Sequence, residues 1–440
     1  MDRSIAMDIS LYRNRRHALA RTMGSGVAVL PTAPERTRNR DAHYPYRFDS
    51  YFYYLTGFRE PAAVLVLVAG TEPRSVLFCR EKDPDKEVWD GFRYGPEAAR
   101  SVFGFDEAYP ISQLDAVMPQ FLADQTAVYC HLGGDAEWDA RVLGWVNAVR
   151  ERVRAGVNAP AEFRDVHALL DEMRLIKDAA ELATMRRAAG ISAAAHRRAM
   201  RAARPGAWEY EIEAELVHEF RRNGAQAPAY TPIVAGGARA CVLHYVENNG
   251  VLRDGELLLI DAGCELDGYA ADITRTFPVN GRFSGPQRDI YELVLAAQQA
   301  AIAAVRPGNP WIAPHEAAVE VLARGMIDLG LLTGTLEDVL EKEAYKPFYM
   351  HRTGHWLGLD VHDAGGYRQS GAWRPLASGM VLTVEPGCYV RAGPDVPEHY
   401  AGIGVRIEDD VVVTSAGCEI LTHEAPKAID DIEAWMREAT

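Results

Sequence analysis

The chain has 440 residues, of which 48% are hydrophobic and 25% are charged, and its formal net charge at pH 7 is -15. This length exceeds what one hydrophobic core usually supports, so the sequence predicts a globular protein of two domains. The acidic balance argues against a nucleic-acid partner, because binding to phosphates needs a basic face.

The first residues lack the basic start and apolar core of a secretory leader, so we expect no signal peptide. The densest apolar run, residues 62–70, is too short to span a bilayer and is typical of a buried strand. The six cysteines, at positions 79, 130, 241, 264, 388 and 418, form no C-x-x-C pair, which argues against a zinc knuckle or a redox motif. We therefore expect a cytoplasmic protein with free thiols and no membrane partner.

The first part of the chain alternates short β-rich runs with helical stretches, which indicates an α/β domain. The predicted strands are residues 27–31, 63–69, 75–80 and 126–131, and the predicted helices are residues 11–23, 111–122 and 138–154. Residues 81–95 are charged and turn-rich, which predicts an exposed loop. Its Trp89 and Phe92 either anchor a contact elsewhere or tuck into their own domain.

Residues 163–203 form a continuous run of helix-favouring residues that ends before Pro205-Gly206. Within this run Asp178 fits a helix N-cap, and Glu181 occupies the reciprocal position of a capping box. We place the domain boundary near residue 175, so that the first domain covers residues 1–175 and the second covers residues 176–440.

The second part of the chain contains an internal repeat. In each half an Arg-Pro-Gly triplet precedes a predicted helix, over residues 209–222 in the first half and 314–329 in the second. Each half then reaches an apolar strand that ends in an acid, and a second acid lies further downstream. This order predicts a pseudo-two-fold α+β domain with four carboxylates converging on its axis: Asp261 and Asp272 from the first half, Glu385 and Glu408 from the second.

Asp261 and Asp272 flank a predicted hairpin. A turn centred on Leu266-Asp267 pairs the two acids directly, whereas a turn at Asp267-Gly268 places Asp272 opposite residue 263. Both registers put the two acids on the same face of the sheet, because side-chain direction repeats every two residues. Like charges at that separation repel unless a cation or a proton lies between them.

A cluster of histidines follows in the second half, at His351, His355 and His362. Its H-x-x-x-H spacing resembles the helical zinc motif H-E-x-x-H, but an arginine replaces the glutamate and Thr353-Gly354 disfavours a helix, so we reject a zincin. A looped segment that delivers one imidazole ligand is the better interpretation. His244, beside a glycine-rich loop, is a further candidate.

The charges of the four carboxylates indicate which ions they bind together with one of the histidines. Two divalent cations neutralise four carboxylates, and one imidazole completes the set of ligands. A shell dominated by oxygen favours Mn²⁺, with Zn²⁺ or Co²⁺ as substitutes. Two such ions roughly 3.5–4 Å apart share a water and lower its pKa toward 7, which gives a hydroxide nucleophile at neutral pH. The sequence therefore predicts a two-metal hydrolase.

The order Asp, Asp, His, Glu, Glu with these flanks resembles the pita-bread metallopeptidases, which include methionine aminopeptidase, prolidase and aminopeptidase P. The segment HRTGHWLGLDVHD at residues 351–363 is similar to the aminopeptidase P and prolidase signature. The tyrosine-rich residues 44–58, followed by Glu60-Pro61, resemble the N-terminal domain of bacterial aminopeptidase P. The resemblance covers about residues 10–425 and implies an α/β N-terminal domain followed by an α+β pita-bread catalytic domain.

The resemblance also implies roles for individual residues. It implies that Glu385 shuttles a proton from the nucleophilic water to the leaving prolyl nitrogen, and that His362 steadies the tetrahedral intermediate. It assigns the proline-side pocket to His244, His351 and Arg406, with Arg406 also holding the metal-site carboxylates. The implied ligands of the two metal ions are Asp261, Asp272, His355, Glu385 and Glu408, with Asp272 and Glu408 bridging.

The implied activity is release of the N-terminal residue from peptides whose second residue is proline. The nearest alternative is a prolidase, which acts on Xaa-Pro dipeptides only, and the tyrosine-rich segment favours aminopeptidase P. Two further alternatives share the fold, and the intact ligand set argues against both. Creatinase, which hydrolyses a C–N bond without metal, lacks these ligands, and non-catalytic peptide-binding modules usually lose some of them. The resemblance further implies a homo-oligomer, a dimer or tetramer, in which the loop around Trp89 approaches the active site of a neighbouring subunit.

Overall fold

The computed structural model describes residues 9–438, which divide between Met173 and Arg174 into two compact units. Each unit has its own hydrophobic core. The six cysteines are free thiols, as predicted, and five of them are buried. Within the described range no helix is both long and apolar enough to cross a membrane.

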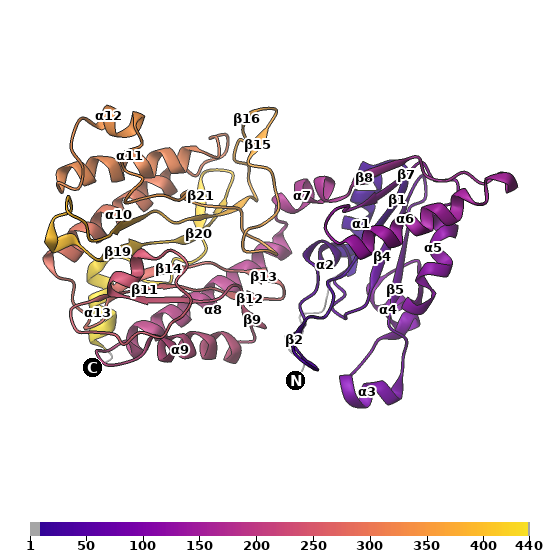
Figure 1. The fold of residues 1–440 in the computed structure, drawn as a ribbon, viewed down its shortest axis with the longest axis horizontal. Helices are drawn as coiled ribbons and strands as arrows, with labels where there is room; N and C mark the ends of the chain where they lie inside the picture. Colours follow the sequence, from indigo (N-terminus) through magenta and orange to yellow (C-terminus); the bar gives the residue numbers. More distant parts are fainter. Residues whose placement is uncertain (1–8, 439–440) are drawn as a thin grey trace. The chain divides into compact units, whose positions relative to one another are not determined.

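The first unit is built around a six-stranded sheet in the order β6-β5-β4-β1-β7-β8 (Figure 1). The strands are β1 (Gly26–Pro31), β4 (Val64–Ala69), β5 (Arg74–Cys79), β6 (Glu107–Pro110), β7 (Ala127–Cys130) and β8 (Glu162–Asp165), and a separate ribbon consists of β2 (Thr37–Asn39) and β3 (Ala42–His43). The helices are α1 (Ile9–Met23), α2 (Ser50–Thr56), α3 (Pro84–Asp90), α4 (Gly95–Phe103), α5 (Leu114–Leu122), α6 (Ala136–Arg150) and α7 (His167–Leu175), which crosses the boundary.

The sheet of the first unit is mostly parallel. β4 runs antiparallel to both of its neighbours, and the other five strands share one direction. Because side chains alternate along a strand, Val27 and Val29 on β1 face the same side, where they pack with α5 and α6. On the opposite side α1 packs against β4 and α2. The unit is therefore the predicted α/β domain with helices on both faces.

Two predictions for the first unit were wrong in part. Residues 163–165 do not start a helix, because they belong to β8 and pair with the parallel strand β7 at the sheet edge. Residues 81–95 are not all loop, because they contain α3, which Asp83 caps through the amide of Lys86. The side chains of Trp89 and Phe92 are 87% and 65% exposed, so they do not tuck into the core of their own unit.

The second unit combines paired helices with short antiparallel strands (Figure 1). The helices are α8 (Ala179–Ala202), α9 (Glu209–Arg222), α10 (Gly285–Ala304), α11 (Ala313–Asp328), α12 (Leu336–Glu341) and α13 (Ile429–Arg437). The strands are β9 (Ala227–Pro228), β10 (Ile233–Gly236), β11 (Leu257–Asp261), β12 (Cys264–Leu266), β13 (Tyr269–Ala270), β14 (Thr274–Pro278), β15 (Arg368–Gln369), β16 (Ala372–Trp373), β17 (Val381–Val384), β18 (Gly387–Val390), β19 (Ile403–Arg406), β20 (Asp409–Val413) and β21 (Cys418–Ile420).

The two halves of this unit repeat one order of elements, as the sequence predicts. α8 packs against α9 in the first half, and α10 packs against α11 in the second. β11 pairs with β14, and β17 pairs with β20, both antiparallel. α9 has the predicted bounds, and Asp178 and Glu181 form the predicted capping box at the start of α8.

The hairpin between β12 and β13 settles the register that the sequence left open. Asp267 and Gly268 both have positive φ, 52° and 86°, as a two-residue hairpin turn requires. Leu266 therefore pairs with Tyr269, and further along the same register Asp261 pairs with Thr274. This register places Asp272 opposite residue 263, diagonal to Asp261 on the same face.

Candidate metal centre

A cavity of about 470 Å³ lies in the second unit. It gathers every residue to which the sequence or the resemblance gave a metal, catalytic or pocket role. These residues come from both halves of the repeat, so the fold brings together side chains that are far apart along the chain. They are His244, Asp261, Asp272, His351, His355, His362, Glu385, Arg406 and Glu408.

The first pair of acids meets around a tyrosine. Asp261 ends β11, and Asp272 lies in the break between β13 and β14 rather than inside one strand. The hydroxyl of Tyr230 donates to Asp261 Oδ1 at 2.6 Å and also lies within hydrogen-bond reach of Asp272 Oδ1. A phenol carries one proton, so it satisfies only one of the two acids at a time. The remaining repulsion favours a cation between them.

His355 lies in a non-helical segment, as predicted. Its Nδ1 donates to the carbonyl oxygen of Trp356 at 2.9 Å, so Nε2 keeps its lone pair for a ligand. Nε2 lies 3.5 Å from Asp272 Oδ2 and 3.6 Å from Glu385 Oε1. Although burial alone lowers it, these two carboxylates raise the pKa of His355 to about 9. The site thus favours a positive charge at Nε2, which a proton or a metal ion supplies.

The second pair of acids belongs to the second half of the repeat. Glu385 follows β17, and Glu408 precedes β20. Because Val384 pairs with Asp409, the two glutamates occupy the next opposite positions along the same two strands. Oε2 of Glu408 also accepts a hydrogen bond from the hydroxyl of Thr274 at 2.7 Å, which ties it to the first half.

The carboxylates are buried against one another. Burial raises the pKa of Glu385 to about 7, and the charge of Asp272 adds to the rise. Burial and the charge of Asp272 raise the pKa of Glu408 well above its usual range. Burial and the charge of Asp261 raise the pKa of Asp272. These three acids, together with Asp261 and the imidazole of His355, are a donor set that fits divalent cations.

Arg406 connects these acids to the histidine cluster. From the end of β19, its Nη2 donates to Asp261 Oδ2 at 2.6 Å and its Nη1 donates to the hydroxyl of Tyr389 at 3.0 Å. The same hydroxyl lies 2.8 Å from Nε2 of His351. Burial, with the charge of Arg406 adding to it, lowers the pKa of His351 to about 4, so this imidazole is neutral near pH 7.

His362 and His244 line the cavity from two loops. The ring of His362 packs edge-on against His355, with ring centroids 4.4 Å apart. Burial and the neighbouring His355 lower the pKa of His362, which leaves a neutral imidazole able to donate a hydrogen bond. His244 follows the short 3₁₀ helix at Gly237–Cys241.

Sequence reasoning did not identify Tyr230, Thr274 and Tyr389, although all three contact the residues above. Thr274 stands two residues after Asp272, so the period of two along a strand is a signal that would have found it. Tyr389 lies on β18, two residues after Gly387. Tyr230 precedes β10 with no motif around it, and only the fold reveals its position.

Two groups of side chains in the described part of the chain have spacing suited to a metal ion. One is Asp272, His355 and Glu408 in the cavity, with ligand atoms within 4.8 Å of one another. The other is His131, Asp165 and His167 in the first unit. There the two imidazole rings are stacked, 4.1 Å apart and 14° from parallel, so their lone pairs do not converge on one ion. We assign a metal only to the first group.

Comparison with known proteins identifies the family. The model of metallopeptidase family M24 matches residues 183–415, and that of the aminopeptidase P N-terminal domain matches residues 12–129. The chain belongs to metallopeptidase family M24. The Xaa-Pro aminopeptidase of Haemophilus influenzae is 46% identical over 423 residues, which cover 96% of each chain. This M24 peptidase therefore has the predicted order of an α/β N-terminal domain and a pita-bread catalytic domain.

Solved structures of aminopeptidases agree with this assignment. The structure of an aminopeptidase from Pseudomonas aeruginosa is similar with a TM-score of 0.97 and 51% identity, and the match covers 99% of both chains. A zinc-substituted aminopeptidase P of Escherichia coli in complex with product is similar with a TM-score of 0.96 and 45% identity, again over 99% of both chains.

Proposed function

We propose that this M24 metallopeptidase is an Xaa-Pro aminopeptidase, which releases the N-terminal residue from peptides whose second residue is proline. The convergence of four carboxylates and one imidazole in a single cavity supports the chemistry. The near full-length similarity to Xaa-Pro aminopeptidases supports the specificity. An Xaa-Pro bond needs a dedicated enzyme, because proline has no N–H and its ring fixes φ.

We propose two divalent ions per chain, most favourably Mn²⁺, with Zn²⁺ or Co²⁺ as substitutes. When bound, such a pair lowers the pKa of a shared water and polarises the scissile carbonyl. The raised pKa values of Asp272, Glu385 and Glu408 support a cation-binding role for these acids. The proposed ligands are Asp261, Asp272, His355, Glu385 and Glu408.

The remaining roles follow from the protonation states of the chain's own groups. Glu385, with a pKa near neutrality, suits a group that accepts a proton from water and delivers it to the leaving prolyl nitrogen. His362 is neutral and donates to the developing oxyanion. His244, His351 and Arg406 line the side of the cavity that takes proline, and Arg406 holds Asp261 in place.

Replacing Glu385 tests this assignment. Glu385→Ala removes a ligand and the proton carrier together, so turnover should fall at least 10³-fold while the circular dichroism spectrum is unchanged. Metal content is measured in the same preparation. Near-normal turnover with both ions present would refute the role given to Glu385.

A prolidase is the second candidate, since it uses the same cage on dipeptides alone. Initial rates on an Xaa-Pro dipeptide and on the matching Xaa-Pro-Yaa tripeptide, with added Mn²⁺, separate the two activities. We expect the tripeptide to be the better substrate, and a strong preference for the dipeptide would overturn the proposal. A folded preparation that holds no divalent ion would instead favour a non-catalytic peptide-binding module.

We further propose that residues 1–175 and 176–440 act as the N-terminal and catalytic domains of a cytoplasmic homo-oligomer, a dimer or tetramer. The exposed Trp89 on α3 supports a role for this segment at a subunit contact, because a large apolar side chain that is 87% exposed is costly to leave in water. Light scattering that compares the molar mass of Trp89→Ala with that of the unchanged protein tests the contact.

A further inference from the structure

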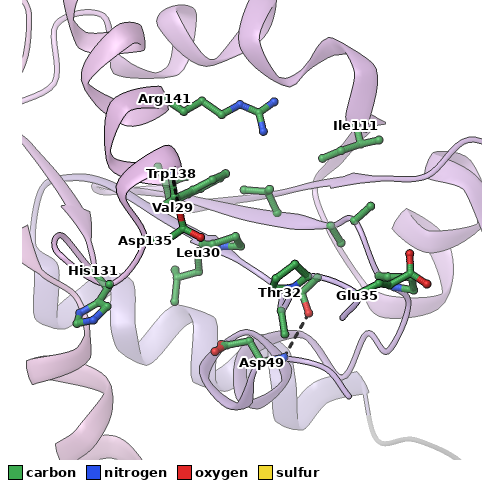
Figure 2. A pocket seen from close by; sticks show the side chains of 18 of the residues that line it. Val29, Leu30, Thr32, Glu35, Asp49, Ile111, His131, Asp135, Trp138 and Arg141 are labelled. Atoms are coloured by element: carbon green, nitrogen blue, oxygen red, sulfur yellow. Dashed lines mark hydrogen bonds between the residues drawn. The ribbon is translucent and has the colours of Figure 1, made fainter. Parts of the chain in front are cut away.

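The first unit contains a cavity of about 720 Å³ for which the proposed activity has no use (Figure 2). It is larger than the cavity of the metal centre and falls within the range of roughly 300–1,000 Å³ that is typical of small-molecule sites. Its floor and walls are mostly apolar. The apolar side chains include Val29, Leu30, Val64, Ile111, Trp138 and Val166.

The cavity lies where the connections that follow β1 and β7 leave the sheet. β1 and β7 are adjacent and parallel, and the chain leaves β1 toward α2 but leaves β7 toward α6. α6 packs with α5 on the face of Val27 and Val29, whereas α2 packs with α1 on the other. The two connections therefore diverge and open a crevice at the carboxyl ends of the strands, which is where open α/β sheets bind ligands. Residues 31–36 and 131–138 of these connections supply much of the lining.

Opposite charges lie on opposite sides of the apolar floor. Figure 2 shows Arg141 beside Trp138 on one side, and Glu35 and Asp49 on the other. Arg141 donates through Nε and Nη2 to Asp115 at 2.6 and 3.0 Å, which leaves Nη1 without a partner in the described chain. Glu35 likewise has no hydrogen-bond or ion-pair partner among residues 9–438.

The helix N-termini at this cavity are already capped. Asp49 caps α2 by accepting from the amide of Phe52, and Asp135 caps α6 by accepting from the amides of Glu137 and Trp138. These amides are therefore not open to an anionic ligand. Among the charged side chains of the lining, Arg141, Glu35 and Arg36 cap no helix, and Arg141 and Glu35 lie on opposite sides of the apolar floor.

We propose that this cavity binds an unblocked short apolar peptide, with the carboxylate of the ligand on Arg141 and its ammonium group on Glu35. The apolar side chains of the ligand lie on Val29, Leu30 and Trp138. A zwitterion engages both Nη1 of Arg141 and the carboxylate of Glu35 at once, whereas a simple anion or cation engages only one of them. The ligand is bound without reaction.

Fluorine NMR on the metal-loaded full chain provides the test. The eight tryptophans are labelled as 5-fluorotryptophan, and Trp138→Phe identifies the resonance of the wall residue. Trileucine is the probe, because it lacks the second-position proline that the proposed activity requires. We expect a saturable shift of the Trp138 resonance. Trileucine amide and N-acetyl-trileucine, which each lack one charge, should bind at least tenfold more weakly.

Matched variants separate contact with the ligand from effects on the fold. Arg141→Gln and Glu35→Gln should each weaken trileucine binding at least fivefold. Asp115→Asn breaks the same ion pair as Arg141→Gln but keeps the guanidinium, so it should retain binding. Arg150→Gln on the same helix, whose partner is Asn147, should also change nothing. All four variants should turn over an Xaa-Pro-Yaa peptide like the unchanged protein.

Three outcomes would overturn the proposal. The first is an unmoved Trp138 resonance at millimolar trileucine. The second is equal binding of trileucine and its two singly charged forms, which would show that the charges play no part. The third is full binding by both Arg141→Gln and Glu35→Gln, which would place the probe elsewhere.

Discussion

The buried ion cluster of Asp409, Arg275 and Lys427, next to Glu408 in the sequence, gives a quantitative test of what stabilises the second unit. Asp409 is fully buried, and its Oδ1 accepts from Arg275 Nη2 at 2.7 Å while its Oδ2 accepts from Lys427 Nζ at 2.5 Å. Removing one member of a buried ion pair costs about 3–5 kcal/mol, because the remaining charge stays buried without compensation. Asp409→Asn should lower the free energy of unfolding of this unit by that amount.

The same cluster connects stability to the metal centre. Arg275 Nη1 donates to the carbonyl oxygens of Thr274 and Glu408, so the guanidinium that Asp409 neutralises also fixes the backbone beside the metal cage. Asp409→Asn should therefore weaken metal binding as well as the fold. Titration with Mn²⁺ followed by calorimetry measures this second effect.

The stability change is measured on metal-free protein, because bound ions stabilise the folded state by mass action. A loss of 3–5 kcal/mol corresponds to a drop of about 6–20 °C in Tm for a unit of this size. The exposed pair of Arg186 and Glu419 is the control, and Glu419→Gln should cost no more than about 1 kcal/mol. A drop of less than 2 °C for Asp409→Asn would refute the reasoning.

The acid dependence of the same variant has a definite sign. The charges of Arg275 and Lys427 outweigh burial and hold the pKa of Asp409 well below its usual range. A carboxyl with a depressed folded pKa contributes stability that is complete above its unfolded pKa of about 3.9 and is lost as the pH falls toward the folded value. The Tm difference between the unchanged protein and Asp409→Asn should therefore be largest above pH 5 and should narrow below pH 4.

Three further changes test the site. Tyr389→Phe removes the hydroxyl that joins Arg406 to His351, so kcat should fall about tenfold with metal content intact, as steady-state rates and metal analysis will show. Gly263→Ala places a Cβ 1.7 Å from the carbonyl oxygen of Ala271, so the hairpin should distort and metal affinity should fall by at least tenfold in calorimetry. Lys177→Met removes a donor at 2.8 Å to the buried Asp363, which follows His362, so kcat should fall several-fold with a smaller change in KM.

Local chemistry explains which parts of the fold the sequence could predict. The capping box of Asp178 and Glu181 and the bounds of α9 follow from interactions between near neighbours, and both predictions are confirmed. β8 was missed because its four residues run directly into a long helix-favouring stretch, and only pairing with β7 marks them as a strand. α3 was missed because its charged residues resemble those of a loop.

The residues of the candidate site also differ in whether the sequence alone reveals them. The acids were identifiable because each occurs at an equivalent point of a repeat, and His351, His355 and His362 because they cluster within one segment. Tyr230 was not identifiable, because its contact with Asp261 and Asp272 depends on where β10 lies beside β11. A contact between side chains on different elements has no local signal, so only the three-dimensional arrangement reveals it.

The electrostatics of the metal centre imply that folding and metal loading are coupled in the second unit. Burial raises the pKa of Asp272, Glu385 and Glu408, so gathering them as charged carboxylates without a cation lowers the stability of the folded unit. A bound cation neutralises these charges, and its binding free energy then adds to the stability of the unit. The core of the first unit contains none of these acids, so chelation should lower the Tm of the second unit selectively. Equal shifts of both units in calorimetry would show that the acids do not carry this coupling.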